Sequence, residues 1–254
     1  PIELVKPFFI IVLSLIITSN KLEHFTLKFI LSLFLTLIIA FFLIIQPDLG
    51  QTLLVGFTWI VLIFISGVNL IFLLSVFMIG VILLLYFTFY VPKFEYIKNR
   101  LLSFFNSENG THNFQSDKAI DSITSGGFFG KGIGEGTLKN RVPEAHTDYI
   151  ISVISEEFGV IVIILILILF LVFIFSILKK VNIEKDHKIK LILVGSASLI
   201  LIQAIIHIGV NIRLLPTTGM TLPFLSYGGS SIISISILSG VILNLTKRKI
   251  FSKK

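Results

Sequence analysis

The chain has 254 residues, of which 55% are hydrophobic and only 14% are charged. A soluble domain of this size carries about a quarter charged residues, so this composition excludes that class and indicates an integral membrane protein. The formal net charge of +7 comes mostly from basic residues in the short gaps between apolar segments. This distribution is typical of the loops that set the topology of a membrane protein, and it does not indicate a nucleic-acid partner.

Seven apolar segments are long enough, or nearly so, to cross a bilayer as helices, which takes about 20 residues. They are 4–20, 27–46, 49–67, 69–91, 149–178, 189–211 and 224–246. Lys6 and Pro7 interrupt the start of the first, where proline is tolerated in the first helical turn. The sequence therefore predicts an all-α polytopic membrane protein in which 1–254 form a single transmembrane domain.

Basic residues in the gaps predict the orientation of these spans. The gaps 20–28 and 179–190 and the tail after 246 are rich in lysine, and seven spans place all three on one side. Short loops rich in lysine and arginine stay in the cytoplasm, so this side and the C-terminus are expected to be cytoplasmic. The N-terminus and the segment 92–148 are then extracytoplasmic.

The segment 92–148 is too long to be a mere connector, and long loops on a rigid scaffold tend to carry function. Its polar middle, 107–117, is expected to be mobile. Six glycines lie between 126 and 136, which indicates a tight backbone with positive φ angles or close approach to another element. No strand precedes these glycines, so a dinucleotide-binding loop is not indicated.

The fifth predicted span begins with polar residues spaced three or four apart, which places them on one face of a helix. These residues are Asp148, Ser152, Ser155, Glu156 and Gly159. Position alone is equally consistent with Asp148 as a helix cap or first-turn acid and with Asp148 as a catalyst. For Glu156 and Glu157, interhelical hydrogen bonding is favoured over catalysis.

A second polar face lies on the sixth predicted span, where Gln203, His207 and Asn211 are four residues apart. Hydrogen bonding between helices is the favoured explanation for it. The absence of cysteine excludes a thiolate metal site, and His112 and His146 show no ligand spacing. Whether a divalent cation (Mg or Mn) is held by carboxylates together with phosphate oxygens remains open.

Four motifs, in their order and spacing, resemble the SEDS family (shape, elongation, division and sporulation). They are QPDLGQ at 46–51, SGGFFGKGIGEGT at 125–137, VPEAHTDYIISVISEEFG at 142–159 and LLPTTGMTLPFLSYGGSS at 214–231. The sequences PEAHTD and GMTLPF within these motifs are more similar to the division branch of the family than to the elongation branch. The resemblance implies about ten spans, and it implies that the first three are missing here, because PIELVKPFF is similar to the start of the family's fourth span.

The resemblance implies that the protein is a peptidoglycan glycosyltransferase that polymerises lipid II, the undecaprenyl-pyrophosphate disaccharide pentapeptide, during cell division. It assigns Asp148 as the general base of an inverting displacement. It also implies a location in the cytoplasmic membrane at the septum, in contact with membrane lipids. A class B penicillin-binding protein and other division proteins are the implied partners.

Several further residues are candidates for binding the substrate. Cations expected to meet the pyrophosphate are Lys6, Lys131, Arg141 and Arg213. Glu144 and His146 are expected to orient or tune Asp148, with anchoring of the loop as an alternative of equal weight. Thr218 departs from the division branch, which often has lysine there, so one cation that could meet the pyrophosphate is missing.

Two other functions stay open at this point. A lipid II flippase or transporter would use Glu156, Gln203 and His207 as a polar path through the membrane. A non-catalytic, truncated scaffold of the division complex is also consistent with the missing spans.

Overall fold

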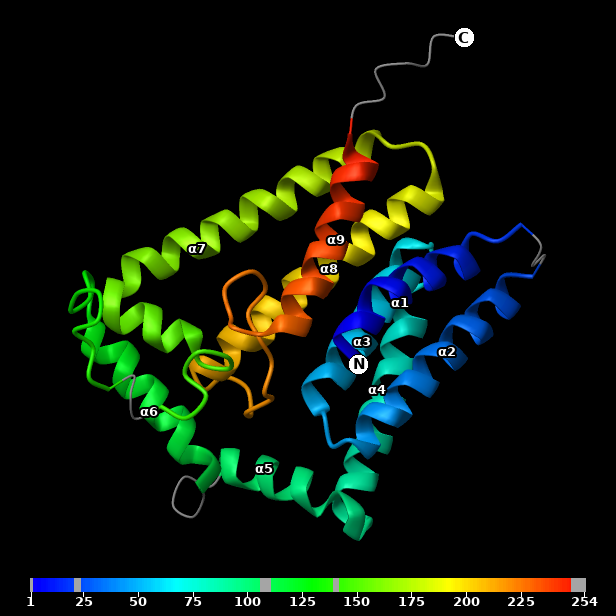
Figure 1. Ribbon diagram of the computed structural model, residues 1–254. Coiled ribbons are helices and arrows are strands. Elements are labelled where there is room, and N and C mark those ends of the chain that lie inside the picture. Colours follow the sequence, from blue (N-terminus) through cyan, green and yellow to red (C-terminus); the bar gives the residue numbers. More distant parts are fainter. Residues whose placement is uncertain (1, 21–23, 106–110, 139–141, 248–254) are drawn as a thin grey trace.

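The computed structural model describes residues 2–20, 24–105, 111–138 and 142–247, and the described residues contain no strand. The helices of Figure 1 are α1 (Ile2–Ile17), α2 (Phe25–Ile45), α3 (Leu49–Ile65), α4 (Leu70–Tyr90), η1 (Pro92–Phe94), α5 (Glu95–Phe105), α6 (Thr111–Gly126), α7 (Ile150–Ile183), α8 (His187–Asn211) and α9 (Gly229–Thr246). The predicted all-α architecture is confirmed, and each of the seven predicted spans overlaps one helix.

Helix α8 forms the centre of the bundle, where it contacts α1, α3, α6, α7 and α9. Its side chains Leu193, Leu199 and Ile200 are completely buried, and they pack in the same cluster as Leu13 of α1 and Leu62 of α3. The polar face of α8 is therefore held in the protein interior, away from lipid.

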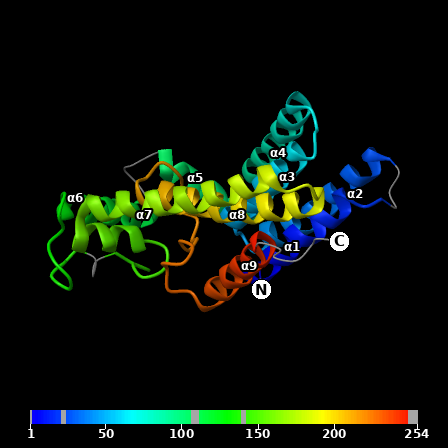
Figure 2. The ribbon, with the colours of Figure 1, turned by 90° about the horizontal axis from the view of Figure 1, so that it is seen from above.

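Helices α4 and α7 lie at the outside of the bundle, and α4 leans away from its neighbours in Figure 2. Their large apolar side chains, such as Ile71 and Phe175, are exposed on the surface. Within the described residues, five helices, α2, α4, α7, α8 and α9, are long and apolar enough to cross a membrane. Since α1 has 16 residues and α3 has 17, the count of seven spans stays a prediction.

Helix α7 is not the single straight span that the sequence predicts. Gly159 interrupts it with φ 80° and ψ 177°, and Figure 1 shows its two parts meeting at a sharp bend. A β-carbon at Gly159 would lie 2.2 Å from the carbonyl oxygen of Phe128, so only glycine fits. The first part, 150–158, packs against α6, and the second part is the long apolar span.

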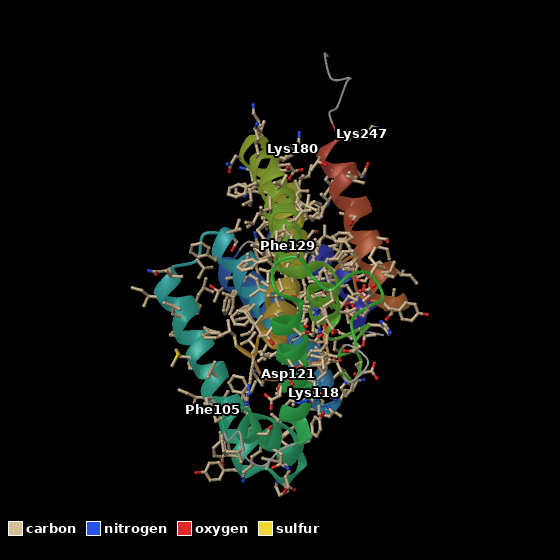
Figure 3. All side chains as sticks on the ribbon, turned by 90° about the vertical axis from the view of Figure 1, so that its left-hand side faces the viewer. Phe105, Lys118, Asp121, Phe129, Lys180 and Lys247 are labelled. Atoms are coloured by element: carbon tan, nitrogen blue, oxygen red, sulfur yellow. The ribbon has the colours of Figure 1, made fainter. Side chains whose placement is uncertain are left out.

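Much of the predicted loop 92–148 is helical. It contains η1, α5 and α6, and residues 111–117, which were expected to be mobile, belong to α6. Figure 3 shows Phe105 and Lys118 of this segment at one end of the molecule, with Lys180 and Lys247 at the other end. Helices α5 and α6 therefore form a helical layer towards the end opposite the lysine-rich one, whereas Phe129 of the glycine-rich loop lies midway between the two ends in Figure 3.

The start of the last helix also differs from the sequence prediction. Residues 224–228 were placed in the seventh span, but α9 begins only at Gly229. Phe224 has a φ of 68°, and the hydroxyl of Ser226 accepts a hydrogen bond from the amide of Leu222 at 2.8 Å. This turn keeps residues 212–228 as an irregular connector next to the site.

Candidate functional site

Asp148 lies at a cavity of about 170 Å³ between the helical layer and the end of α8. The residues that line it come from α5 (Tyr96 and Arg100), α6 (Gln115), the turn before α7 (Asp148 and Tyr149), α8 (Val210) and the connector (217–220). The N-cap of α7 is Tyr149, so Asp148 is not a helix cap. The sequence left open whether Asp148 caps a helix or acts as a catalyst. Its position at the cavity favours a role at the site over a role as a helix cap.

The environment of Asp148 changes its proton affinity. Burial raises the pKa of this carboxyl above its ordinary value, and the charge of Glu144 raises it further. A hydrogen bond from Thr147 and the charge of Arg100 act in the opposite direction. A carboxylate with a raised pKa is a stronger base than an exposed one, which suits it to accept a proton near neutral pH.

A tight turn positions Asp148. The carbonyl oxygen of Glu144 accepts the amides of Thr147 at 3.1 Å and of Asp148 at 3.0 Å, and Glu144 itself has a φ of 53°. The turn is held on the connector, because Ser226 donates its hydroxyl to the carbonyl of Thr147 at 2.6 Å. The amide of Tyr227 donates to the carbonyl of His146 at 3.0 Å.

The polar face of α8 supports the same region, and its Gln203 also accepts a hydrogen bond from Lys6 of α1, which is the contact between helices that the sequence suggested. Asn211 donates its side-chain amide to the carbonyl of Asp148 at 3.0 Å. His207 Nδ1 lies 2.7 Å from the carbonyl oxygen of Met220, and Gln203 donates to the carbonyl of Thr221 at 2.9 Å. Backbone groups outside regular helices need hydrogen-bond partners when they are buried. These buried side chains of α8 supply such partners to the connector.

Lys6, a candidate for binding pyrophosphate, is completely buried in a network outside the lining of the cavity. Its Nζ lies 2.7 Å from Glu3 and 3.2 Å from the side-chain oxygen of Gln203. Gln51 donates to the same Glu3 oxygen at 2.8 Å. The network joins α1, α3 and α8, and it neutralises the charge of Lys6.

Lys131 is also paired, with Glu156 at 3.3 Å. Glu156 is completely buried, and it accepts hydrogen bonds from the Ser122 hydroxyl and from the amide of Leu138, both at 3.0 Å. The predicted interhelical role of Glu156 is thereby confirmed. Neither Lys131 nor Glu156 lines the cavity of Asp148, so this pair anchors the glycine-rich loop and not the cavity.

The structure separates the remaining candidates. Arg213 forms an ion pair with Asp117 at 2.5 Å, whereas Arg141 lies outside the described residues. Glu144 and His146 are exposed. His146 lines a different pocket, next to Tyr227, so only Glu144 acts on Asp148, through its charge.

Sequence reasoning missed Arg100, which lines the cavity with Asp148. Its guanidinium donates to the hydroxyl of Tyr96 and lies 4.7 Å from the centre of that ring. The available signal was the four-residue spacing of Tyr96 and Arg100, which places both on one helical face. That signal was lost because the segment was expected to be a loop.

The described residues contain no group of three or more histidine, aspartate or glutamate side chains placed to hold a metal ion. A divalent cation that also takes phosphate oxygens as ligands stays a prediction.

Residues 1–250 match the model of the cell cycle protein family of FtsW, RodA and SpoVE. A probable peptidoglycan glycosyltransferase FtsW of Caulobacter vibrioides is 33% identical over 98% of this chain and 63% of its own length. The FtsW of Geobacter metallireducens that carries the same description is 34% identical over 91% of this chain and 61% of its own length. The chain thus spans about three fifths of the length of these relatives.

Two solved structures share the fold and are each 25% identical in sequence. One belongs to a peptidoglycan synthase complex described as coordinating polymerization and crosslinking, with a TM-score of 0.75 over 99% of this chain and 71% of that chain. The other is a mutant of the rod shape determining protein RodA of Thermus thermophilus, with a TM-score of 0.66 over 99% of this chain and 67% of that chain.

Proposed function

Since this chain belongs to the SEDS family of FtsW, RodA and SpoVE, we propose that it is a peptidoglycan glycosyltransferase of cell division that polymerises lipid II. Relatives more than 30% identical are named probable peptidoglycan glycosyltransferases. The observation that carries the proposal is the placement of Asp148 at a small polar cavity, where burial raises the pKa of its carboxyl. The cavity lies between α5, α6 and the C-terminal end of α8, on the side that we propose faces outward.

The chemistry needs one base. The acceptor sugar hydroxyl attacks the anomeric carbon of the donor, and Asp148 takes the hydroxyl proton as the new glycosidic bond forms. The bond from the anomeric carbon to the diphosphate oxygen breaks, and its electron pair leaves with the diphosphate. An α-linked donor gives a β-linked product by this single displacement. No protein nucleophile is required, because the diphosphate is already a good leaving group.

Orientation and partners complete the proposal. Figure 3 places Lys180 and Lys247 at the end of the molecule away from α5 and α6, which supports a cytoplasmic C-terminus and an outward-facing site. A multi-pass protein of this family would act at the division septum. The similarity to a complex that combines polymerization and crosslinking supports a class B penicillin-binding protein as partner.

A polymerisation assay with purified lipid II in detergent tests the proposal. Asp148→Asn keeps the shape of the side chain but removes the base, so glycan chains should fall below detection. Asp121→Asn is the matched control, since it removes an exposed carboxylate from α6 outside the cavity. Undiminished polymerisation by Asp148→Asn contradicts the assignment of the base.

The same preparations distinguish the two other functions. Glu156, Gln203 and His207 are engaged in hydrogen bonds within the protein, which favours a structural role for them over a flippase path. Translocation of lipid II in vesicles without polymerisation would nevertheless establish a flippase. A wild-type chain that binds a transpeptidase but forms no glycan would establish a scaffold.

A further inference from the structure

The glycine-rich loop after α6, residues 127–136, displays three large apolar side chains on its surface. Their exposed fractions are 74% for Phe128, 84% for Phe129 and 79% for Ile133. A single exposed apolar residue is ordinary, but three within six residues form a patch of the kind that marks an interaction surface. These side chains therefore indicate contact with a partner or with lipid.

The backbone of the loop is fixed to the start of the long part of α7. The amide of Val160 donates to the carbonyl of Gly127 at 3.0 Å, and in the opposite direction the amide of Lys131 donates to the carbonyl of Glu156 at 2.9 Å. These hydrogen bonds join the loop to both sides of the bend at Gly159, so the loop cannot slide along α7 without breaking them. The apolar side chains are therefore held at the level where the long part of α7 begins.

The length of α7 places this level at one edge of the hydrocarbon core. Residues 160–178 carry no charge, and Lys179 and Lys180 follow at the lysine-rich end of the molecule. From Val160 to Lys180 the helix rises about 30 Å at 1.5 Å per residue, which equals the thickness of the hydrocarbon core of about 30 Å. A helix tilt of about 20° shortens this rise by only about 2 Å. The loop thus lies at the boundary away from the lysine-rich end, and Figure 3 accordingly shows Phe129 between Lys180 and Phe105.

The patch continues into a surface of α7 that faces lipid. The amide of Ile161 donates to the carbonyl of Phe128 at 3.4 Å, and the side chain of Ile161 is half exposed. Leu165 and Ile168 follow on the same helical face and are exposed as well. Because acyl chains cover this face in a bilayer, lipid is the occupant that fits the adjoining loop. The pairing of loop amides with α7 lowers the cost of bringing irregular backbone close to lipid.

We propose that Phe128, Phe129 and Ile133 insert into the interfacial region of the bilayer and anchor the glycine-rich loop there. Apolar side chains of elements that lie in this interface reach about 5–10 Å into the boundary between headgroups and acyl chains. The inference requires only that α7 crosses the membrane, and it does not rest on glycosyltransferase activity. Since residues 150–158 of α7 lead from the loop back to Asp148, the anchor holds this carboxyl at a fixed height relative to the lipid headgroups.

Spin labelling of the full chain in lipid nanodiscs tests the anchor. The chain contains no cysteine, so Phe129→Cys provides a single labelling site without other substitutions. A nitroxide at this position should be relaxed strongly by oxygen, which concentrates in the bilayer, and weakly by a water-soluble nickel chelate. Ile133→Cys should give the same result. Because both side chains are exposed, neither substitution removes a packed side chain from the bundle.

Asp121→Cys on α6 is the matched control, since Asp121 is exposed and lies outside the loop. Figure 3 places Asp121 farther from Lys180 than Phe129 is. Its nitroxide should be relaxed strongly by the nickel chelate and weakly by oxygen. An accessibility to nickel in Phe129→Cys that equals that in Asp121→Cys overturns the anchor. Low accessibility to both reagents in Phe129→Cys also overturns it, because protein rather than lipid would then cover the loop.

Hydrogen exchange of the loop amides in nanodiscs measures the anchor without a label. The double variant Phe128→Ser with Phe129→Ser should exchange the amides of residues 127–133 several-fold faster than the wild type, because water then reaches a loop that lipid covers. Phe105→Ser is the control, since it removes a similarly exposed phenylalanine, 77%, from α5. Its loop amides should exchange at the wild-type rate. Equal rates in the wild type and the double variant would overturn the anchor.

Discussion

Asn211, the last residue of α8, donates its side-chain amide to the backbone carbonyl of Asp148 at 3.0 Å. The same amide nitrogen donates to the carbonyl of His207 at 2.9 Å, so one buried side chain joins the central helix to the residue that precedes α7. The position of the proposed base thus depends on the most buried helix of the bundle.

Removing this contact should lower the rate and leave substrate binding nearly intact. Asn211→Ala loses both hydrogen bonds, which costs about 1–2 kcal/mol, and it lets the carboxyl of Asp148 move from its position. Lipid II polymerisation should therefore show a kcat about tenfold lower with a similar KM. Asn244→Ala, at an exposed position of α9, is the control. A wild-type kcat in Asn211→Ala would show that this contact does not position the base.

The pH dependence of polymerisation should report the pKa of Asp148. A general base works only when deprotonated, so activity is lost as the pH falls through a pKa that burial and Glu144 raise above the ordinary value. Glu144→Gln removes one of the causes that raise this pKa. The acid limb of the rate profile should then move to lower pH.

The control for this shift is Glu135→Gln, which removes the same charge from an exposed position in the glycine-rich loop. Its acid limb should coincide with that of the wild type. A limb that moves to higher pH in Glu144→Gln, or moves equally in both variants, is incompatible with a local effect of Glu144 on Asp148.

Glu156 should be needed for stability. Its carboxylate accepts hydrogen bonds from Ser122, Lys131 and Leu138, and Glu156→Ala removes all three of these hydrogen bonds. Thermal unfolding in detergent should show a loss of about 1–3 kcal/mol. The neighbouring Glu157→Ala, at a partly exposed position, should lose less. Equal losses in the two variants would argue against Glu156 as the anchor of the loop.

Two glycines should tolerate no side chain. A β-carbon at Gly130 would lie 2.2 Å from the carbonyl oxygen of Glu157, and one at Gly159 equally close to that of Phe128, both at positive φ. Alanine at either site should lower the unfolding midpoint and speed proteolysis of the loop after α6. Gly240→Ala has open space inside α9, and it should be neutral or stabilising by up to about 1 kcal/mol. Wild-type stability in Gly159→Ala would mean that the bend in α7 is not required.

The sequence by itself determined the positions of the membrane helices. Apolar runs such as 189–211 become helices because backbone groups in a bilayer need partners within their own segment, which is a local requirement. The family resemblance proposed Asp148 as the base, which stays a prediction, and the glycines at 126–136 correctly indicated positive φ and close contact.

Only the tertiary structure decided which charges remain available at the site. Lys6, Lys131 and Arg213 resemble free cations in the sequence, but their partners Glu3, Glu156 and Asp117 are fixed by how the helices pack. Conversely, Arg100 of α5 lines the same cavity as residues 217–220 of the connector, which are far from it in sequence. Pairing and burial depend on contacts between residues distant in sequence, and no local pattern records those contacts.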